Sequence, residues 1–156
     1  MSELIQLNDL DRRILRALQA NAGLHGAALA ESVGSSPASC WRRVKALEEA
    51  GILQEAVRLI NRRAVDRDVD VLCFLRLKSH GRQDARVFEK FVAAEECIQE
   101  CYTVSGEWDY MLRIVVSDIR SYESFLMNTL LSHPTVASAN SQFALSRIKF
   151  TTRVPV

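Results

Sequence analysis

The sequence predicts an α+β fold, in which an N-terminal (winged) helix-turn-helix domain is followed by a C-terminal ferredoxin-like βαββαβ domain. Apolar residues recur at helical spacing as far as Leu53, and farther along the chain they alternate as in half-buried strands. Between the two patterns, the charged stretch RRAVDRD at 62–68 has neither period and is typical of a linker. We therefore expect a helix-turn-helix domain at 1–61, a linker at 62–68 and a second domain at 69–156.

Composition places the chain among ordinary globular proteins, with 48% hydrophobic and 25% charged residues in 156 positions. No apolar run approaches the roughly 18 residues that cross a membrane. The first residues, MSELIQLND, have neither the basic nor the apolar region of a secretory signal. We therefore expect a cytoplasmic protein with no membrane partner. The net charge is only +1, but residues 36–63 hold six Lys or Arg against three Asp or Glu, a weak indication of nucleic-acid binding.

Two helices are predicted at the start of the chain. The first runs from a cap at Asn8 or Asp9 to about Ala20, because apolar residues recur there at spacings of three and four. The glycine-bearing stretch NAGLHG at 21–26 ends it. A shorter helix is expected at about 27–33, and a tight turn then leads into a third helix.

The third predicted helix runs from Pro37 to about Ala50. The Ser36 hydroxyl can accept from free N–H groups of the first turn, and Pro37 suits the first helical position because its missing N–H is not needed there. Gly51 supplies a left-handed residue after the last turn. Apolar residues from Cys40 onward recur at spacings of four and three, so one side of this helix is expected to pack inward.

The opposite side of the third helix carries short polar residues and cations. Small residues permit close approach to a major groove, donors read base edges and cations hold phosphates. A solvated surface helix would look similar, but a short helix, a glycine-bearing turn and this helix together form a helix-turn-helix arrangement. The stretch from Ile52 to about Ile60 is a candidate strand or wing. The residues expected to contact double-stranded DNA are Ser36, Ser39, Arg42, Arg43 and Lys45.

Beyond the linker the predicted order is strand, helix, strand, strand, helix, strand, which is the order of a ferredoxin-like split unit. Alternation predicts the strands, and apolar residues at helical spacing predict the helices. The predicted strands are 69–78, 98–104, 108–116 and 136–150, and the predicted helices are 83–95 and 119–132. The buried stripe of the first of these helices is expected to be Val87, Phe88, Phe91 and Val92.

One face of this predicted sheet lacks a cover. Two helices cover only one face of four strands, yet apolar residues also alternate onto the other face, and an uncovered apolar face usually marks a partner. We therefore expect a homodimer, sheet against sheet, which would also relate two helix-turn-helix units by a two-fold axis. The residues expected in this interface are Leu72, Phe74, Met111 and Val115.

The four cysteines, Cys40, Cys73, Cys97 and Cys101, do not indicate a metal site. The sequence contains no C-x-x-C motif and no cluster of cysteine and histidine, so neither a metal nor another cofactor is expected. Cys40 and Cys73 lie among apolar residues, as packed thiols do. We expect all four to be reduced, with a redox role left open for Cys97 and Cys101.

The N-terminal residues resemble a known family. LDRRILRALQ at 10–19 and LAESVG at 29–34 are followed by a spaced set of residues within 36–47 and by EEAGI at 48–52. Together they resemble the DNA-binding domain of the Lrp/AsnC, or feast/famine, transcription regulators. The resemblance is weaker at the start of the second helix and at two positions around the third. The departures are Gly23, His25, Gly26, Ser35 and Trp41.

The C-terminal residues resemble the same family. VSGEWDYMLR at 104–113 is similar to its Gly-x-x-Asp-Tyr-x-x-Arg segment, and SHPTV at 132–136 to its closing segment. The resemblance implies a domain that dimerises, assembles dimers into octamers or similar rings, and binds a small effector, typically an amino acid. It also implies that Asp109 receives the effector's ammonium group beside Gly106; pairing of Asp109 with Arg113 or with a loop N–H is the alternative. The last strand would line the pocket with Ser138, Asn140, Ser141 and Gln142.

The expected function is that of a sequence-specific DNA-binding transcription regulator whose assembly or DNA affinity responds to a small effector. Two alternatives remain open. The two-domain plan also resembles that of siroheme decarboxylases, but ECYT at 100–103 replaces that family's His-Asn-Tyr-type segment. Because no P-loop, G-x-S-x-G or H-E-x-x-H motif occurs either, we expect no enzyme. The second alternative is a DNA-compacting protein without an effector.

Overall fold

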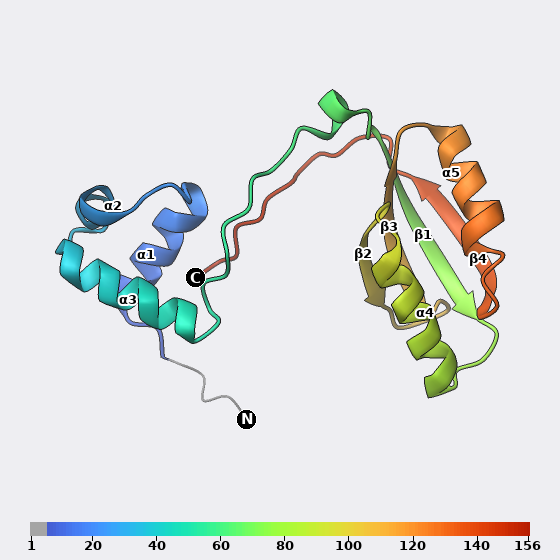
Figure 1. The fold of residues 1–156 in the computed structure, drawn as a ribbon, viewed down its shortest axis with the longest axis horizontal. Helices are drawn as coiled ribbons and strands as arrows, with labels where there is room; N and C mark the ends of the chain where they lie inside the picture. The colour runs from blue at the N-terminus through green and yellow to red at the C-terminus, as the bar shows by residue number, and fades with distance from the viewer. Residues whose placement is uncertain (1–5) are drawn as a thin grey trace. The chain divides into compact units, whose positions relative to one another are not determined.

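The computed structural model describes residues 6–156, which form two compact units (Figure 1). One unit contains the chain up to Leu59 together with Lys149–Val156, and the other is Ile60–Ile148. The division differs from the predicted domains, because 62–68 belongs to the second unit and the tail groups with the first. None of the helices formed by residues 6–156 is long and apolar enough to span a membrane.

The N-terminal unit contains three helices close to the predicted positions. They are α1 (Asp9–Ala20), α2 (Gly26–Val33) and α3 (Pro37–Glu49). Asn8 caps α1 in a reciprocal capping box with Asp11. Gly34 ends α2 and Gly51 follows α3, both with a positive φ that glycine adopts without strain. Local chemistry along the chain therefore accounts for where these helices start and stop.

A buried apolar cluster joins the three helices and includes the inward stripe of α3. Its members are Ile14, Leu15, Leu29, Ala30, Val33, Cys40 and Leu47. The tail of the chain adds to this unit: Gln19 donates to the Val154 carbonyl at 3.1 Å and accepts from the Val154 N–H at 2.6 Å. Val156 packs against the cluster. Because this cluster holds one side of α3, the opposite side faces solvent.

The stretch after α3 is not a strand. The prediction of a strand or wing from Ile52 to about Ile60 is wrong for the single chain, because residues 53–61 pair with no other described segment as a ladder. A strand needs a partner for its N–H and C=O groups, and an apolar stretch alone does not supply one. Within the predicted linker, Arg62–Val65 form a 3-10 turn, η1, capped by Asn61.

The C-terminal unit is a four-stranded antiparallel sheet with strand order β2-β3-β1-β4. Helices α4 and α5 both lie on one face of it (Figure 1). The strands are β1 (Val69–Leu77), β2 (Ile98–Thr103), β3 (Tyr110–Val116) and β4 (Val136–Phe143). The helices are α4 (Arg82–Ala94) and α5 (Ile119–Phe125), which continues as the π-helical turn η2 (Leu126–Leu130). The predicted β-α-β-β-α-β order and the α+β fold class are confirmed.

The helix-covered face of the sheet holds the core of this unit. Val71, Cys73 and Leu75 of β1 alternate onto that face and are fully buried with Leu112 of β3 and Phe88 of α4. Alternation along β1 therefore separates the core from the uncovered face, as the sequence predicts.

Two details of this unit differ from the prediction. Val87 is exposed rather than part of the buried stripe of α4, which Phe88 dominates. The last strand ends at Phe143 instead of near Phe150, because its partner β1 begins at Val69 and leaves the later residues without a ladder.

Candidate nucleic-acid interface and effector site

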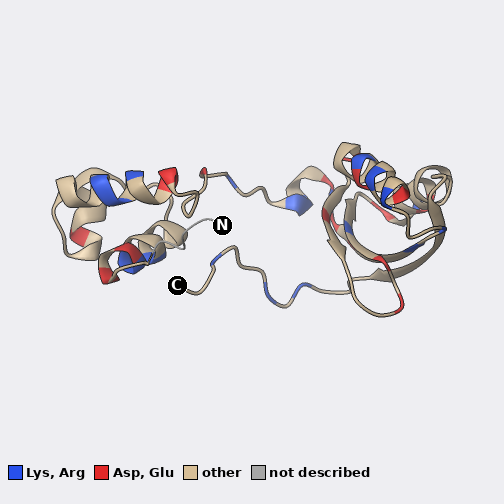
Figure 2. Ribbon diagram, turned by 90° about the horizontal axis from the view of Figure 1, so that it is seen from below, with Lys and Arg blue, Asp and Glu red and all other residues tan. Residues whose placement is uncertain are grey.

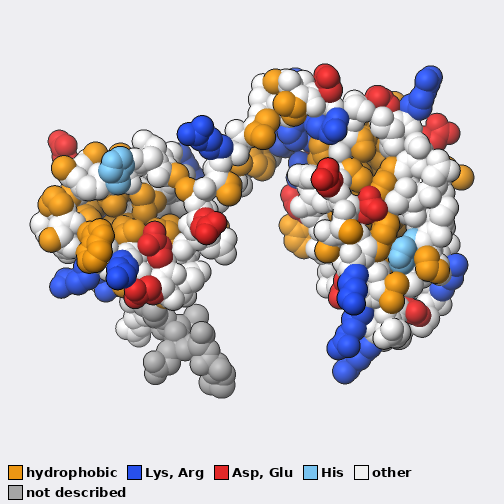
Figure 3. Space-filling model, in the orientation of Figure 1, with side chains coloured by type: hydrophobic (Ala, Val, Ile, Leu, Met, Phe, Trp, Pro, Cys, Tyr) orange, Lys and Arg blue, Asp and Glu red, His pale blue; other side chains and the backbone are white. Residues whose placement is uncertain are grey.

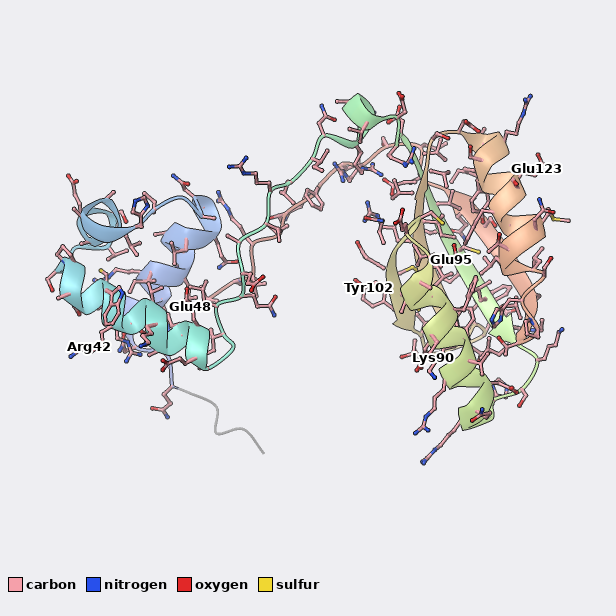
Figure 4. All side chains as sticks on the ribbon, viewed as in Figure 1. Arg42, Glu48, Lys90, Glu95, Tyr102 and Glu123 are labelled. Atoms are coloured by element: carbon pink, nitrogen blue, oxygen red, sulfur yellow. The ribbon has the colours of Figure 1, made fainter. Side chains whose placement is uncertain are left out.

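The candidate DNA-binding surface begins at the N-terminus of α3. The Ser36 hydroxyl accepts from the Ser39 N–H at 3.2 Å and caps the helix. Arg42 is exposed and extends from α3 on the side away from α1 and α2 (Figure 4). Together with Ala38 and Trp41, these residues line a shallow hollow. The first turns of α3 therefore present small side chains and one long cation to an approaching ligand.

Arg43 does not share this outward orientation. Its Nε and Nη2 donate to the two carboxylate oxygens of Asp11, each at 2.6 Å. Asp11 is fully buried and also accepts from the Asn8 N–H at 3.0 Å. Burial raises the pKa of Asp11, but the hydrogen bonds from Arg43 and Asn8 outweigh it, and the pKa lies below its ordinary value. The predicted phosphate contact of Arg43 is thus replaced by a clamp between α1 and α3.

Lys45 lies beside the outer surface of α3 and makes only weak contacts there. Its Nζ is 3.8 Å from Oε1 of Glu49 and 5.4 Å from the centre of the Trp41 ring. Exposed pairs of this kind contribute little to stability, so the ammonium group remains available to a phosphate. Figure 2 shows the cations of α3 gathered ahead of the acidic residues at its end.

The candidate effector carboxylate, Asp109, lies just before β3, next to the end of β1. Its Oδ2 accepts from the Leu77 N–H at 2.8 Å, and its Oδ1 is 3.4 Å from Nδ1 of the exposed His80. The predicted alternative partner, Arg113, is engaged elsewhere on the sheet. One oxygen of Asp109 is therefore used by a backbone N–H of strand β1 rather than of a loop, while the second faces a surface histidine.

The turn before Asp109 is held by Arg76. The Arg76 Nε donates to the Glu107 carbonyl at 2.8 Å, and its Nη2 donates to Oε1 of Glu107 at 2.6 Å. Its guanidinium also lies 5.1 Å from the centre of the Trp108 ring. Gly106 has a φ of 105°, and a Cβ built there would meet nothing within 4 Å. The backbone at Gly106 is accordingly open to close approach.

The polar residues of β4 are divided between the two faces of the sheet. Ser138, Asn140 and Gln142 pair with residues of β1 that lie on the uncovered face. Ser141 points to the helix-covered face, where its hydroxyl is hydrogen-bonded to that of Tyr122. Ser141 is therefore separated by the sheet from the other three, because successive strand residues face opposite ways.

The residues predicted at the dimer interface lie together on the uncovered face. Phe74 of β1 is directly opposite Met111 of β3, and Leu72 follows on the same side. All three are half-buried in the single chain, whereas Val115 is already buried. Val115 borders a hollow with Val65 of η1, so the turn that precedes β1 shelters it.

The same face carries an ion network that the sequence did not indicate. Asp70 is buried; its Oδ2 lies 2.6 Å from Nη2 of Arg62 and its Oδ1 lies 3.1 Å from Nε of Arg113. Arg113 also contacts Glu100 at 2.9 Å, and Glu100 accepts from the Tyr102 hydroxyl at 3.0 Å. Figure 4 shows Tyr102 extending from β2 away from α4. Asp70 lies two residues before Leu72 in the same strand, so alternation could have predicted that it shares the uncovered face. Alternation could not have predicted that Arg62 and Arg113 are its partners.

The cysteines are free thiols in the structure. Cys40 and Cys73 are buried, and burial raises the pKa of the half-buried Cys97 and Cys101, which disfavours the reactive thiolate. Within residues 6–156 no group of three or more His, Cys, Asp or Glu side chains is placed to hold a metal ion.

The capped α3 with its cationic outer face, following a short helix and a tight turn, forms the helix-turn-helix arrangement of a DNA-binding domain, and an α+β unit with one uncovered sheet face follows it. Residues 7–54 match the winged helix-turn-helix DNA-binding family. Residues 70–154 match the family described as the Lrp/AsnC ligand binding domain. The chain therefore belongs to the Lrp/AsnC family of transcription regulators.

Relatives resemble this chain over nearly its whole length. The transcriptional regulator AzlB of Bacillus subtilis is 32% identical over 97% of this chain and 97% of its own length. The leucine-responsive regulatory protein of Salmonella typhimurium is 35% identical over 96% of this chain and 92% of its own. A transcriptional regulator from Neisseria meningitidis, solved as a complex with L-Met, superposes with a TM-score of 0.92 at 33% identity, covering 96% and 97% of the two chains.

Proposed function

We propose that this protein is a sequence-specific DNA-binding transcription regulator whose assembly or DNA affinity responds to a small effector, an amino acid. The observation that carries the DNA-binding part is the outer face of α3, where a capped first turn and the exposed Arg42 lie opposite the buried stripe. A helix with this pattern fits the major groove, as the recognition helix of a helix-turn-helix unit does.

Each residue of this face has a role in the proposal. The small side chains of Ser36 and Ser39 allow the helix end to approach the DNA, and Arg42 reads a base edge, for which the bidentate pairing of arginine with guanine is the commonest specific contact. Lys45 holds a phosphate. Arg43 acts indirectly: its two hydrogen bonds to Asp11 keep α3 fixed on α1.

The proposed effector site is centred on Asp109. An effector's ammonium group would bind Oδ1, which faces the surface beside His80, while Oδ2 stays bound to the Leu77 N–H. The effector carboxylate would take backbone N–H groups at the Gly106 turn. The ligand-binding domain family and the L-Met complex of the Neisseria regulator support an amino acid as the ligand class.

Assembly links the two functions in this proposal. Two copies would pair through the uncovered sheet faces at Leu72, Phe74 and Met111, and dimers would associate further into an octamer or a similar ring. Ser138, Asn140 and Gln142 share the uncovered face with these residues, so an effector near β4 would bear directly on assembly. Such coupling makes the effector change the spacing of recognition helices and hence DNA affinity.

The experiment is a thermal-shift screen of the twenty amino acids, followed by calorimetric titration of the strongest one into wild type and two variants. Binding to the native state raises the unfolding midpoint by mass action. Asp109→Asn keeps an oxygen for the Leu77 N–H but removes the charge, so it should retain wild-type stability and lose effector affinity at least tenfold. Asp109→Ala should lose both the effector and the hydrogen bond to Leu77.

Ser141→Ala is the matched control, because Ser141 lies on the helix-covered face and should leave effector affinity unchanged. Equal effector affinity in wild type and Asp109→Asn would remove Asp109 from the site. A screen in which no amino acid shifts the midpoint would leave the DNA-binding part of the proposal standing without its effector.

A further inference from the structure

Trp41 of α3 has an exposed indole that is not part of the buried cluster of its unit. Its exposed fraction is 68%, whereas the neighbouring Cys40 is buried in the cluster that holds the helix. Within the described chain, the Trp41 ring faces the Lys45 ammonium, which lies 5.4 Å from the ring centre. An exposed cation–π pair of this kind contributes little, so the fold does not account for a large apolar side chain at this position.

The surroundings of Trp41 indicate what kind of partner would cover it. The indole and the Ala38 methyl group form the apolar part of the shallow hollow at the start of α3, with Ser36, Ser39 and Arg42 around them. Figure 3 shows hydrophobic side chains directly beside Lys and Arg side chains on this unit. An apolar patch bordered by cations and by a capped helix end complements an anionic groove that also presents apolar groups, which describes DNA.

The chemistry of the bases indicates which group of the DNA the indole would contact. Thymine is the base that offers a methyl group in the major groove, and apolar side chains recognise it there. Successive helix residues point about 100° apart around the helix axis, so Trp41 and Arg42 would reach different bases of one site. We propose that Trp41 selects a thymine in the operator by packing its indole against the C5 methyl group, near the guanine that Arg42 reads. This inference rests on the proposed DNA-binding function and specifies one base of the site.

The test removes single methyl groups from the DNA. Wild-type protein is first used to select its site from a pool of random duplexes, and each thymine of the selected site is then replaced by deoxyuridine, which differs only in lacking that methyl. At one thymine, wild type should lose about three- to fivefold in affinity, the size expected for one buried methyl group. Trp41→Ala should bind the thymine and deoxyuridine duplexes equally, and Trp41→Phe should retain the preference.

Trp41→Ala in the protein and deoxyuridine in the DNA form a double-mutant cycle, which isolates the interaction between the indole and the thymine methyl group. Ile119→Ala removes an exposed apolar side chain of α5, outside the proposed sites, and should leave the deoxyuridine effect as in wild type. If no thymine shows the effect in wild type, or if Trp41→Ala keeps it, the inference is overturned while the DNA-binding function stands. If wild type selects no sequence at all, both are overturned. A uniform loss of affinity in Trp41→Ala, independent of the methyl group, would assign the indole to the sugar-phosphate backbone instead and also overturn the inference.

Discussion

Each unit of the protein buries an aspartate in an ion pair, and the two pairs differ in how fully the single chain satisfies them. In the N-terminal unit, both oxygens of Asp11 are engaged, by two nitrogens of Arg43 and by the Asn8 N–H. In the C-terminal unit, Oδ1 of Asp70 lies 3.1 Å from Nε of Arg113 in an ion pair, but it forms no hydrogen bond within residues 6–156. Its partner Arg62 likewise leaves two buried nitrogens, Nε and Nη1, without a hydrogen-bond acceptor among residues 6–156.

The buried aspartate of the N-terminal unit is therefore more fully hydrogen-bonded than that of the C-terminal unit. Buried polar groups are almost always hydrogen-bonded, and leaving one unpaired is costly. In the helix-turn-helix unit, the described residues themselves tie α3 to α1, through the Asp11–Arg43 pair and the buried cluster. The uncovered face of the sheet combines unsatisfied polar groups with Leu72, Phe74 and Met111, and we interpret it as a surface completed by a second copy of the chain.

The largest expected effect is on assembly, at the uncovered face. Phe74→Glu would place an unpaired carboxylate in the proposed interface, at a cost of several kcal/mol. Light scattering should therefore find a monomer at concentrations where wild type is a dimer or larger. Val87→Glu introduces the same charge at an exposed position of α4 and should keep the wild-type mass. If the two variants have equal mass, the uncovered face does not assemble the protein.

The next effect is on the stability of the N-terminal unit. Arg43→Ala leaves the buried Asp11 without its charged partner, and breaking a buried pair in this way costs about 3 kcal/mol. The measurement is urea unfolding followed by circular dichroism. Arg42→Ala removes the neighbouring, exposed arginine and should change stability by less than about 0.5 kcal/mol. Similar midpoints for the two variants would show that the clamp does not stabilise the unit.

The same pair should produce a pH dependence with a defined sign. Because the folded-state pKa of Asp11 lies below its ordinary value, the contribution of the pair is fully present above the unfolded carboxyl pKa of about 3.9. It is lost as the pH falls through the lower folded-state pKa. Urea midpoints of wild type should therefore fall toward those of Arg43→Ala in this acid range, and a constant gap between them would contradict the assignment.

The smallest expected effects are on DNA affinity, where two variants distinguish a residue that reads a base from one that contacts a phosphate. Arg42→Ala should lose about 2 kcal/mol on the selected duplex and relax the preference at one base pair. Lys45→Ala should weaken all sequences alike and reduce the salt dependence by about one counterion. Fluorescence anisotropy at several salt concentrations distinguishes these outcomes. Wild-type affinity in both variants would place the DNA contact elsewhere.

Sequence reasoning succeeded where the relevant interaction spans a few residues. The cap at Ser36, the proline at position 37 and the stop at Gly51 act locally, so α3 could be delimited in advance. The clamp could not, because Arg43 and Asp11 are 32 positions apart. Asp11 does lie three residues before the buried Ile14, so its inward orientation was open to prediction, but its partner was not.

In the sheet, alternation within a strand predicted the face on which a residue lies, but the sequence did not predict how far neighbouring strands pair. The period of two placed Phe74 and Met111 on the uncovered face, as the register confirms. The same period places Ser141 and Asn140 on opposite faces of the sheet. The prediction that both line one pocket did not take this into account. Strand β4 ends at Phe143 because β1 offers no hydrogen-bonding partners beyond that point. This limit is set by β1 and cannot be predicted from the residues of β4.

We propose that an amino acid alters how this chain engages DNA. The most direct test is an anisotropy titration of wild type onto its selected duplex, without and with each of the twenty amino acids at saturating concentration. We predict that at least one amino acid shifts the midpoint by about fivefold or more, the size of a typical allosteric coupling. Superimposable titrations for all twenty would contradict the claim.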